Sequence, residues 1–397
     1  MSCAQGRLAR AGEERRLKRQ YLHAFIAAAA VGPFLSYVLT DLGWSPRYIG
    51  YATAVLTASA VVTAPVWGWV DDVTDGAAAR ISLLATAAAS VMVMLSLLRL
   101  GTGATLVSIA VLGSASGSIE ALLTTRTLRD PGAAGRLGTT RSLGSVGWIL
   151  GLGLGGLLLT YSRTSALVLL VAAVAALTAP PPSRTPRSSP REPGVTGRRA
   201  RPPLRAVLSV LSLTFPLPLC TAALVYFTAG WAREDLGAGP LVAVGPLALS
   251  AALELPAFVV VDRLARRLTS VALCALAFPP LGIASLLLGL TPSQATLFAV
   301  QPLVALSFAL WFVSQSRLVA DRVADHQLAS ALALVSTLGR GIAGPLAGIA
   351  GGAIAAAGGY PALFFAMATV SVLGLLRALL PLRTEQPLRN RQKERAS

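Results

Sequence analysis

The chain has 397 residues, of which 54% are hydrophobic and only 13% are charged, whereas soluble domains carry about 25% charged residues. With a mean hydropathy of +0.66, this composition excludes an ordinary water-soluble domain. The net charge of +17 is a feature of nucleic-acid-binding proteins, but the placement of the charges, described below, argues against such a partner. Cys3, Cys220 and Cys274 are too scattered for a disulfide framework or a zinc site, so we expect neither a metal nor a cofactor.

Long apolar runs are the main feature of the sequence. A helix of about 20 apolar residues crosses the hydrocarbon core of a bilayer. We therefore predict an all-α membrane protein with twelve spans in two groups of six. The expected spans are residues 21–40, 48–70, 81–100, 103–124, 142–161, 164–180, 206–230, 239–261, 269–290, 294–316, 328–355 and 360–381.

The longest gap between spans separates the two groups. From Pro180 to Arg205 it contains eight prolines and seven arginines, a composition that cannot bury a core. We predict a tail at 1–20, a six-helix bundle at 21–180, a linker at 181–205, a second bundle at 206–382 and a tail at 383–397. Pro216 and Pro218 should kink the seventh span, since a proline removes a backbone hydrogen bond.

Basic residues lie almost entirely on one side of the predicted spans. Of the 34 Lys and Arg residues, 28 fall in both tails, the linker and the loops of that side, and four fall on the other side. Because basic loops stay in the cytoplasm, we expect both termini and the linker to be cytoplasmic in a cell-membrane protein. The positive charge then reflects topology and attraction to lipid headgroups.

The two halves repeat in parallel. Gly144, Gly147, Gly151 and Gly155 recur 197 residues later as Gly341, Gly344, Gly348 and Gly352. Ladders of small residues at this spacing let membrane helices approach closely. Two six-helix repeats about an axis along the membrane normal are typical of secondary transporters.

Four stretches carry a resemblance to a known family. They are Pro65-Val-Trp-Gly-Trp-Val-Asp71, Arg141-Ser-Leu-Gly-Ser-Val-Gly-Trp148, Glu254-Leu-Pro-Ala-Phe258 with Asp262 and Arg263, and Gln301 with Phe308, Trp311 and residues 317–321. In order and on the expected spans, they resemble the major facilitator superfamily. Within it they are most similar to the group that holds lactose permease and the phenylpropionate-permease-like proteins. The resemblance implies alternating access about a central cavity, with Asp71, Asp262 and Arg263 in gating loops.

The chain departs from these relatives at two points. Asp72 stands where the first signature usually has an arginine, which puts a gating ion pair there in doubt. The tenth span, at 294–316, lacks the His and Glu that lactose permease uses for proton coupling, so that mechanism does not carry over.

Three residues of the first half are candidates for substrate binding. The resemblance matches Glu120 and Arg141 to groups that bind sugar in lactose permease, and Trp148 to the ring that stacks on it. Arg141 and Trp148 are seven residues apart and so share a helix face. The simpler alternative is that Glu120 pairs with Arg126 or Arg141 and that Trp148 only packs.

The second half has its own candidates. A charge at mid-membrane costs about 2.5–3.5 kcal/mol on insertion scales and needs a reason. Glu254 is a candidate proton carrier or substrate contact, and Arg340 a candidate for anion binding. The alternative is that these two charges pair with each other. Gln301, Phe308, Phe312 and Gln315, with Trp311 beside them, form a stripe that suits an amphipathic ligand or simply packs.

These observations predict a secondary active transporter, not an enzyme. It would move a small organic solute, with proton coupling through Glu254 or Glu120, and act as a monomer in membrane lipid. One alternative is a drug or metabolite exporter of the same fold. The other is a membrane sensor that transports nothing.

Overall fold

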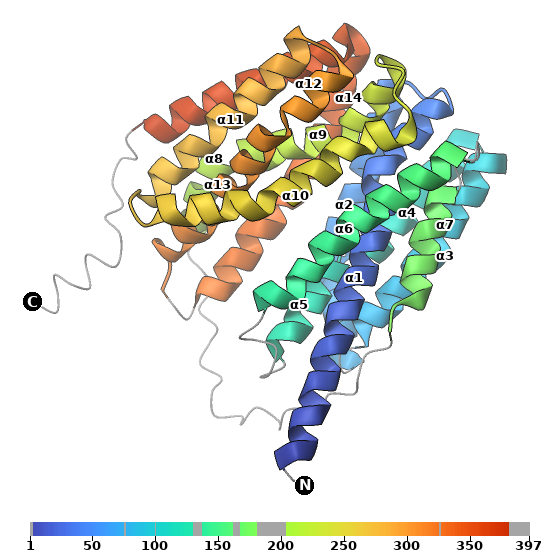
Figure 1. Cartoon of the computed structure of the whole chain (residues 1–397), viewed down its shortest axis with the longest axis vertical. Coiled ribbons are helices and arrows are strands. Elements are labelled where there is room, and N and C mark those ends of the chain that lie inside the picture. The colour runs from blue at the N-terminus through green and yellow to red at the C-terminus, as the bar shows by residue number, and fades with distance from the viewer. Residues whose placement is uncertain are drawn as a thin grey trace, which may run out of the picture. The chain divides into compact units, whose positions relative to one another are not determined.

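The computed structural model describes residues 3–74, 77–99, 101–129, 137–161, 167–180, 204–324 and 327–380. Every regular element in these ranges is a helix (Figure 1). Among them, nine helices are long and apolar enough to cross a membrane, and a bent pair makes ten. The all-α membrane class is thus confirmed. The helices are α1 (Cys3–Asp41), α2 (Pro46–Val73), α3 (Ala78–Arg99), α4 (Gly101–Ser116), α5 (Ile119–Arg129), α6 (Leu137–Tyr161), α7 (Leu167–Thr178), α8 (Leu204–Thr214), α9 (Pro216–Glu234), α10 (Pro240–Ala265), α11 (Ser270–Leu290), α12 (Gln294–Ala299), α13 (Gln301–Ala320) and α14 (Leu328–Leu379).

The remaining predicted spans are present in altered form. The sixth is the shorter apolar helix α7. The eleventh and twelfth run together as α14, which contains a kink at Gly359, where φ is 75°. A positive φ is readily adopted only by glycine, so this residue can turn the chain between the two spans.

Prolines and hydroxyl residues set several helix boundaries. The predicted kink in the seventh span is confirmed, since α8 and α9 are bent by 52° and Pro216 starts α9. Pro46 occupies the first turn of α2, where its missing N–H costs nothing. Thr269 caps α11 by accepting a hydrogen bond from the Ala272 amide at 3.2 Å.

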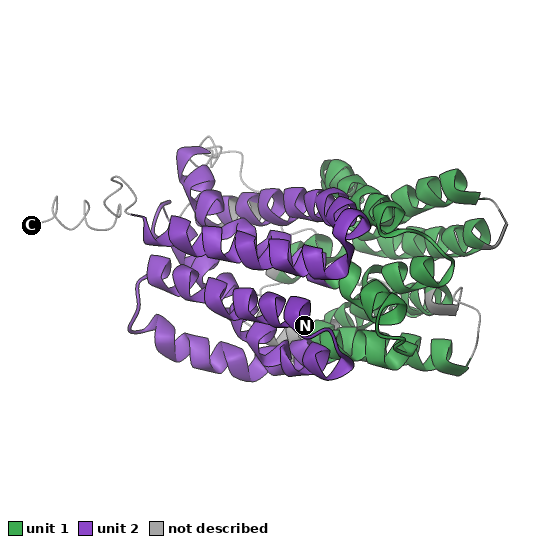
Figure 2. Cartoon of the chain, turned by 90° about the horizontal axis from the view of Figure 1, so that it is seen from above, with its two compact units in different colours: residues 1–191, 225–248 green, residues 192–224, 249–397 purple. Residues whose placement is uncertain are grey.

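The described contacts divide the chain into two compact units, coloured separately in Figure 2. Unit 1 comprises residues 1–191 and 225–248, and unit 2 comprises residues 192–224 and 249–397. In unit 1, α1 packs on α6 and α7, while α4 packs on α2 and α3. In unit 2, α11 packs on α13 and α14. The predicted bundle limits stay a prediction, and nearly all of the linker and the final tail lie outside the described residues.

The glycine ladder of α6 faces α1, as the sequence predicts for a close helix contact. A Cβ atom on Gly147 would lie 2.3 Å from the Leu22 carbonyl oxygen, and one on Gly151 would lie 2.7 Å from that of Ile26. Real Cβ atoms do not approach so closely, so only glycine allows this packing. The close contact between α1 and α6 also fixes the position of Trp148, which follows Gly147 on α6.

Candidate substrate cavity

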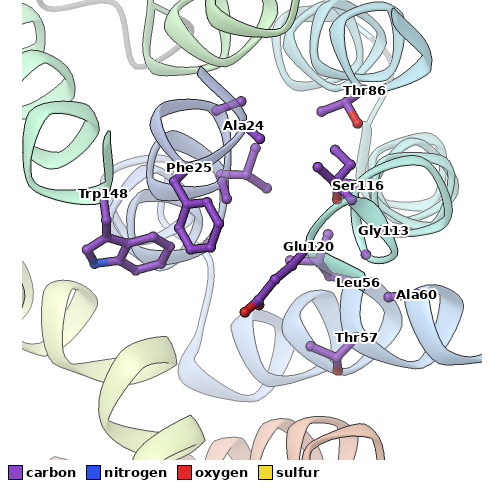
Figure 3. A pocket seen from close by; sticks show the side chains of 16 residues that line it. Ala24, Phe25, Leu56, Thr57, Ala60, Thr86, Gly113, Ser116, Glu120 and Trp148 are labelled. Carbon is purple, nitrogen blue, oxygen red and sulfur yellow. The ribbon is translucent and has the colours of Figure 1, made fainter. Parts of the chain in front are cut away.

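Unit 1 contains a cavity of about 270 Å³ bordered by α1 to α6. Most of its lining is small and apolar, from alanine, glycine and aliphatic residues. Pockets for drug-sized ligands typically measure about 300–1,000 Å³, so this one suits a small molecule. Its polar and aromatic side chains are Phe25, Thr57, Thr86, Ser116, Glu120 and Trp148 (Figure 3).

A short turn within one membrane span lies at the cavity wall. The fourth predicted span is present as one membrane-length segment, Gly101–Thr127, in which a two-residue turn separates α4, which ends at Ser116, from α5, which begins at Ile119. Ser116, Gly117 and Glu120, at and on both sides of the turn, line the cavity. Helical hydrogen bonds continue on both sides of this turn, from the Gly117 amide to the Gly113 carbonyl at 3.0 Å and from the Leu122 amide to the Ser118 carbonyl at 2.9 Å.

Two glycines, in α4 and in the turn that follows it, let this part of the span lie close to α2. A Cβ atom on Gly113 would lie 2.0 Å from the Leu56 carbonyl oxygen, and one on Gly117 would lie 2.1 Å from the Ala60 Cβ. The two backbones therefore touch, which places Thr57 and the start of α5 on the same cavity.

Glu120 stands in the first turn of α5 and is half-buried. Figure 3 shows the carboxylate pointing into the cavity, with Phe25 and Trp148 on one side and the three hydroxyl residues on the other. The structure thus brings Glu120 and Trp148 together, as the resemblance implied.

Arg141, the third member of the predicted group, lies on α6, two turns before Trp148. Its side chain lies outside the described residues. Its part in the site therefore stays a prediction.

The hydroxyl groups of the cavity direct their protons into their own helices. Thr57 donates to the Thr53 carbonyl, Thr86 to that of Ser82 and Ser116 to that of Leu112, each at 2.8 Å. A hydroxyl has one proton but two lone pairs. Each group can therefore only accept a hydrogen bond from a ligand while this bonding persists.

The predicted aromatic stripe in unit 2 forms a packed cluster. Phe258 of α10 lies 5.8 Å from Phe312 and 6.4 Å from Phe308 of α13, between ring centroids. The Trp311 ring is 5.5 Å from that of Phe308. These edge-to-face and tilted arrangements are typical of stabilising aromatic contacts, while Phe312 is 39% exposed, so the role of the stripe stays a prediction.

The two glutamines of the stripe are buried rather than presented to a ligand. Gln301 is 5% exposed and donates its amide to the Leu297 carbonyl at 2.8 Å. Gln315 is 8% exposed. The amide of Gln301 is therefore engaged by the chain itself.

The charged candidates of unit 2 lie on different helices. Glu254 is half-buried on α10, one turn before Phe258, and Arg340 is exposed on α14. Both residues take part in an electrostatic or hydrogen-bonding interaction within the chain. Whether they pair with each other stays a prediction.

The gating-loop candidates differ in their surroundings. Asp71 is 5% exposed at the end of α2, whereas Asp262 and Arg263 are exposed near the end of α10.

Within the first signature, the Trp67 indole donates to the Ser114 carbonyl at 2.6 Å, which ties α2 to α4. This tryptophan has a structural role that sequence reasoning did not assign.

Sequence reasoning also missed Phe25, Thr57, Thr86 and Ser116. These residues come from four helices, and each resembles many other apolar or weakly polar residues of the spans. Thr57, Thr86 and Ser116 share only a hydroxyl group within an apolar run, and Phe25 only its ring, and both signals are too frequent in this chain to single these residues out.

This arrangement, nine or ten membrane-length apolar helices among the described residues with a small cavity between several of them, is that of a multi-pass membrane protein of the transporter class. A family model described as "MFS_1 like family" matches residues 15–189, and one described as "Major Facilitator Superfamily" matches residues 241–397. The chain belongs to the major facilitator superfamily.

Solved structures support the same fold. The nucleoside transporter NupG is 15% identical, with a TM-score of 0.72 over 94% of this chain and 99% of that one. A bacterial homologue of the human lysosomal transporter Spinster, inward-facing and unoccupied, is 15% identical with a TM-score of 0.69 over 94% and 96%. A D-xylose–proton symporter is 12% identical with a TM-score of 0.66 over 92% and 96%. No curated protein matches the sequence.

Proposed function

We propose that this protein is a secondary active transporter that moves a small organic solute across the cell membrane by alternating access. The observation that carries the proposal is the cavity of unit 1, into which the Glu120 carboxylate points from a membrane span (Figure 3). An acidic residue within a membrane span typically marks a substrate or proton path. Superfamily membership supports this reading.

Proton coupling is part of the proposal. Glu120 and Glu254 are the two candidate carriers, because each is a half-buried carboxylate on a membrane helix. The D-xylose–proton symporter is one structural neighbour that couples to protons by its name. Glu254→Gln should keep exchange of substrate across the membrane and lose proton-driven accumulation if Glu254 is the carrier. If Glu120 is the carrier, Glu120→Gln should show that phenotype.

Several finer points belong to the same proposal. The basic-residue asymmetry supports cytoplasmic termini. The four signature stretches support membership of the lactose and phenylpropionate permease group. Arg141 would join Glu120 and Trp148 at the site.

Transport is tested directly with the purified full-length chain. A thermal-shift screen against aromatic acids, sugars and lipophilic cations identifies ligands, and radiolabelled hits are then followed into liposomes. We expect protein-dependent flux of at least one ligand. If ligands bind but none crosses the membrane, the sensor alternative replaces this proposal.

A further inference from the structure

The turn inside the fourth membrane span is held by side chains of neighbouring helices. It consists of residues 117 and 118, and α4 ends just before it at Ser116. In a regular helix each carbonyl accepts from the amide four residues later, so the last carbonyls of a helix need donors from elsewhere. The carbonyls of Ser114 and Ala115 accept from side chains of α2 and α3.

The donor on α2 is Trp67. Its indole Nε1 lies 2.6 Å from the Ser114 carbonyl oxygen. The Thr63 hydroxyl, one turn earlier on α2, lies 3.3 Å from the same oxygen, but it also donates to the Ser59 carbonyl at 2.7 Å. A hydroxyl has a single proton, so Trp67 is the main partner of Ser114 on this helix.

The donor on α3 is Ser82, whose hydroxyl donates to the Ala115 carbonyl. Ser82 is 0% and Ala115 is 4% exposed, so the loss of this donor would fall on a buried carbonyl, where it is costly. The Ser82 carbonyl in turn accepts from the Thr86 hydroxyl at 2.8 Å, and Thr86 lines the cavity. Ser82 therefore links the end of α4 to the cavity wall on α3.

Trp67 and Ser82, the two anchors of the turn, act on the cavity from outside its lining. Neither of them lines the cavity, whereas residues of the turn and beside it do. These lining residues are Ser116, Gly117, Ile119 and Glu120, and Figure 3 shows the side chains of Ser116 and Glu120 at the cavity. Their positions depend on where the turn lies, and the anchors tie the turn to α2 and α3.

We propose that Trp67 and Ser82 are positioning residues of the substrate cavity of unit 1. They hold the turn of the fourth span, and the turn sets where Ser116 and Glu120 stand against a ligand. The inference rests on the proposed transport function, because it takes this cavity as the substrate site. Loss of either bond lets the turn open locally, while α1 stays in place. Local openings of this kind require less free energy than global unfolding.

Two buried serines distinguish local from general opening. Ser118 lies in the turn and is 4% exposed, and Ser36 lies on α1 and is 0% exposed. Each is replaced by cysteine, which has nearly the same shape, in a cysteine-free background. A buried thiol reacts with N-ethylmaleimide only when its segment opens, so the labelling rate of the folded protein in detergent follows the open population.

Substitutions of the anchors are then added to each reporter. With Ser118→Cys, both Trp67→Phe and Ser82→Ala should raise the labelling rate about fivefold, as the loss of one hydrogen bond provides. With Ser36→Cys, neither substitution should change the rate, because the turn opens without α1.

Two matched controls keep the anchors intact. Trp69→Phe changes a tryptophan that is 64% exposed. Ser96→Ala changes a buried serine of α3 whose hydroxyl donates within its own helix, to the Val93 carbonyl at 2.8 Å. Both controls should leave the labelling rates at positions 118 and 36 unchanged.

The labelling rates decide the assignment of each anchor. An unchanged rate at position 118 in a folded anchor variant would overturn the assignment of that residue. An equal rise at positions 118 and 36 would show that the whole unit loosens, and an equal rise in the matched control would show an unspecific effect, and each would overturn the proposal. Should Trp67→Phe not fold, Ser82→Ala decides, since it removes only a single oxygen atom.

Flux measurements separate this inference from the transport proposal. The ligand with the highest flux in the liposome screen is tested with the same variants. Trp67→Phe and Ser82→Ala should raise its half-saturating concentration, whereas Trp69→Phe and Ser96→Ala should not. An unchanged half-saturating concentration in both anchor variants would refute the positioning role and keep the transporter. The expected labelling without flux of any ligand would refute the transporter and keep the anchored turn.

Discussion

Arg233 of α9 and Asp41 of α1 form an ion pair at the ends of their helices, with Arg233 Nη2 2.8 Å and Nε 3.1 Å from Asp41 Oδ1. The Arg233 guanidinium also lies 5.8 Å from the centre of the Tyr37 ring. Nearby, a Cβ atom on Gly230 would be 2.8 Å from the Thr40 hydroxyl, so the two helices approach closely. The pair therefore joins residues far apart in sequence within unit 1.

This ion pair predicts how the stability of the protein responds when the two charges are removed, made alike or exchanged. Because Arg233 and Asp41 are 41% and 31% exposed, its loss in Asp41→Asn should cost less than about 1 kcal/mol. Asp41→Arg sets two guanidinium groups together and should lower the melting temperature further. The swap of both residues should recover most of that loss. Thermal unfolding in detergent checks this, and a double variant no more stable than Asp41→Arg alone would argue against the contact.

The α1–α6 interface predicts sensitivity to a single methyl group. Gly147→Ala places a Cβ atom against the Leu22 carbonyl and should cost about 1–3 kcal/mol through overpacking. Gly153→Ala, on the same helix, meets no atom within 4 Å and is the matched control. The melting temperatures of both variants are compared with that of the parent. Similar values for the two variants would show that α6 does not pack on α1 through this ladder.

The hydrogen bond of Trp67 predicts that Trp67→Phe and Trp69→Phe, at two tryptophans of the first signature, change the stability of the protein by different amounts. Trp67→Phe removes the indole bond to the Ser114 carbonyl and should cost about 1 kcal/mol. Trp69 is 64% exposed, so Trp69→Phe should change stability little. Thermal unfolding again measures both. Greater destabilisation by the Trp69 change would contradict the packing of α2 on α4.

The predicted topology is testable by labelling intact cells. In a cysteine-free background, cysteines at positions 190 and 390 should be protected from an impermeant thiol reagent, because the basic segments around them stay inside. A cysteine at Gly237, between α9 and α10, should react. Labelling of position 190 from outside intact cells would show that the protein has the opposite orientation to the predicted one.

The features that sequence reasoning predicted well are local or periodic. Apolar runs locate the membrane helices, Pro216 marks the bend between α8 and α9, and glycine spacing marks the close face of α6. Each depends on residues near one another along the chain, where composition and spacing hold the information.

The cavity was only partly predictable. Glu120 and Trp148 were found through the resemblance of their local sequence to lactose permease, and the structure brings both to the cavity. The fourth span was predicted as one segment, and the turn between α4 and α5 inside it has no sequence signal, since Gly117 and Ser118 sit within a continuous apolar run. Thr57 reaches the cavity only because Gly113 and Gly117 let α4 contact α2. Such a tertiary contact has no signature in either helix alone.

Two-sided access to the cavity of unit 1 tests the transporter claim most directly, without any knowledge of the substrate. Ala28 is exposed and lines the cavity, whereas Ala52 of α2 is fully buried and serves as the control. Each is replaced by cysteine in a cysteine-free background and treated with an impermeant thiol reagent in right-side-out and inside-out vesicles. A protein that alternates access should label at Ala28→Cys in both preparations and at Ala52→Cys in neither. Labelling of Ala28→Cys from one side only, under every condition of pH and ligand, would contradict alternating access through this cavity.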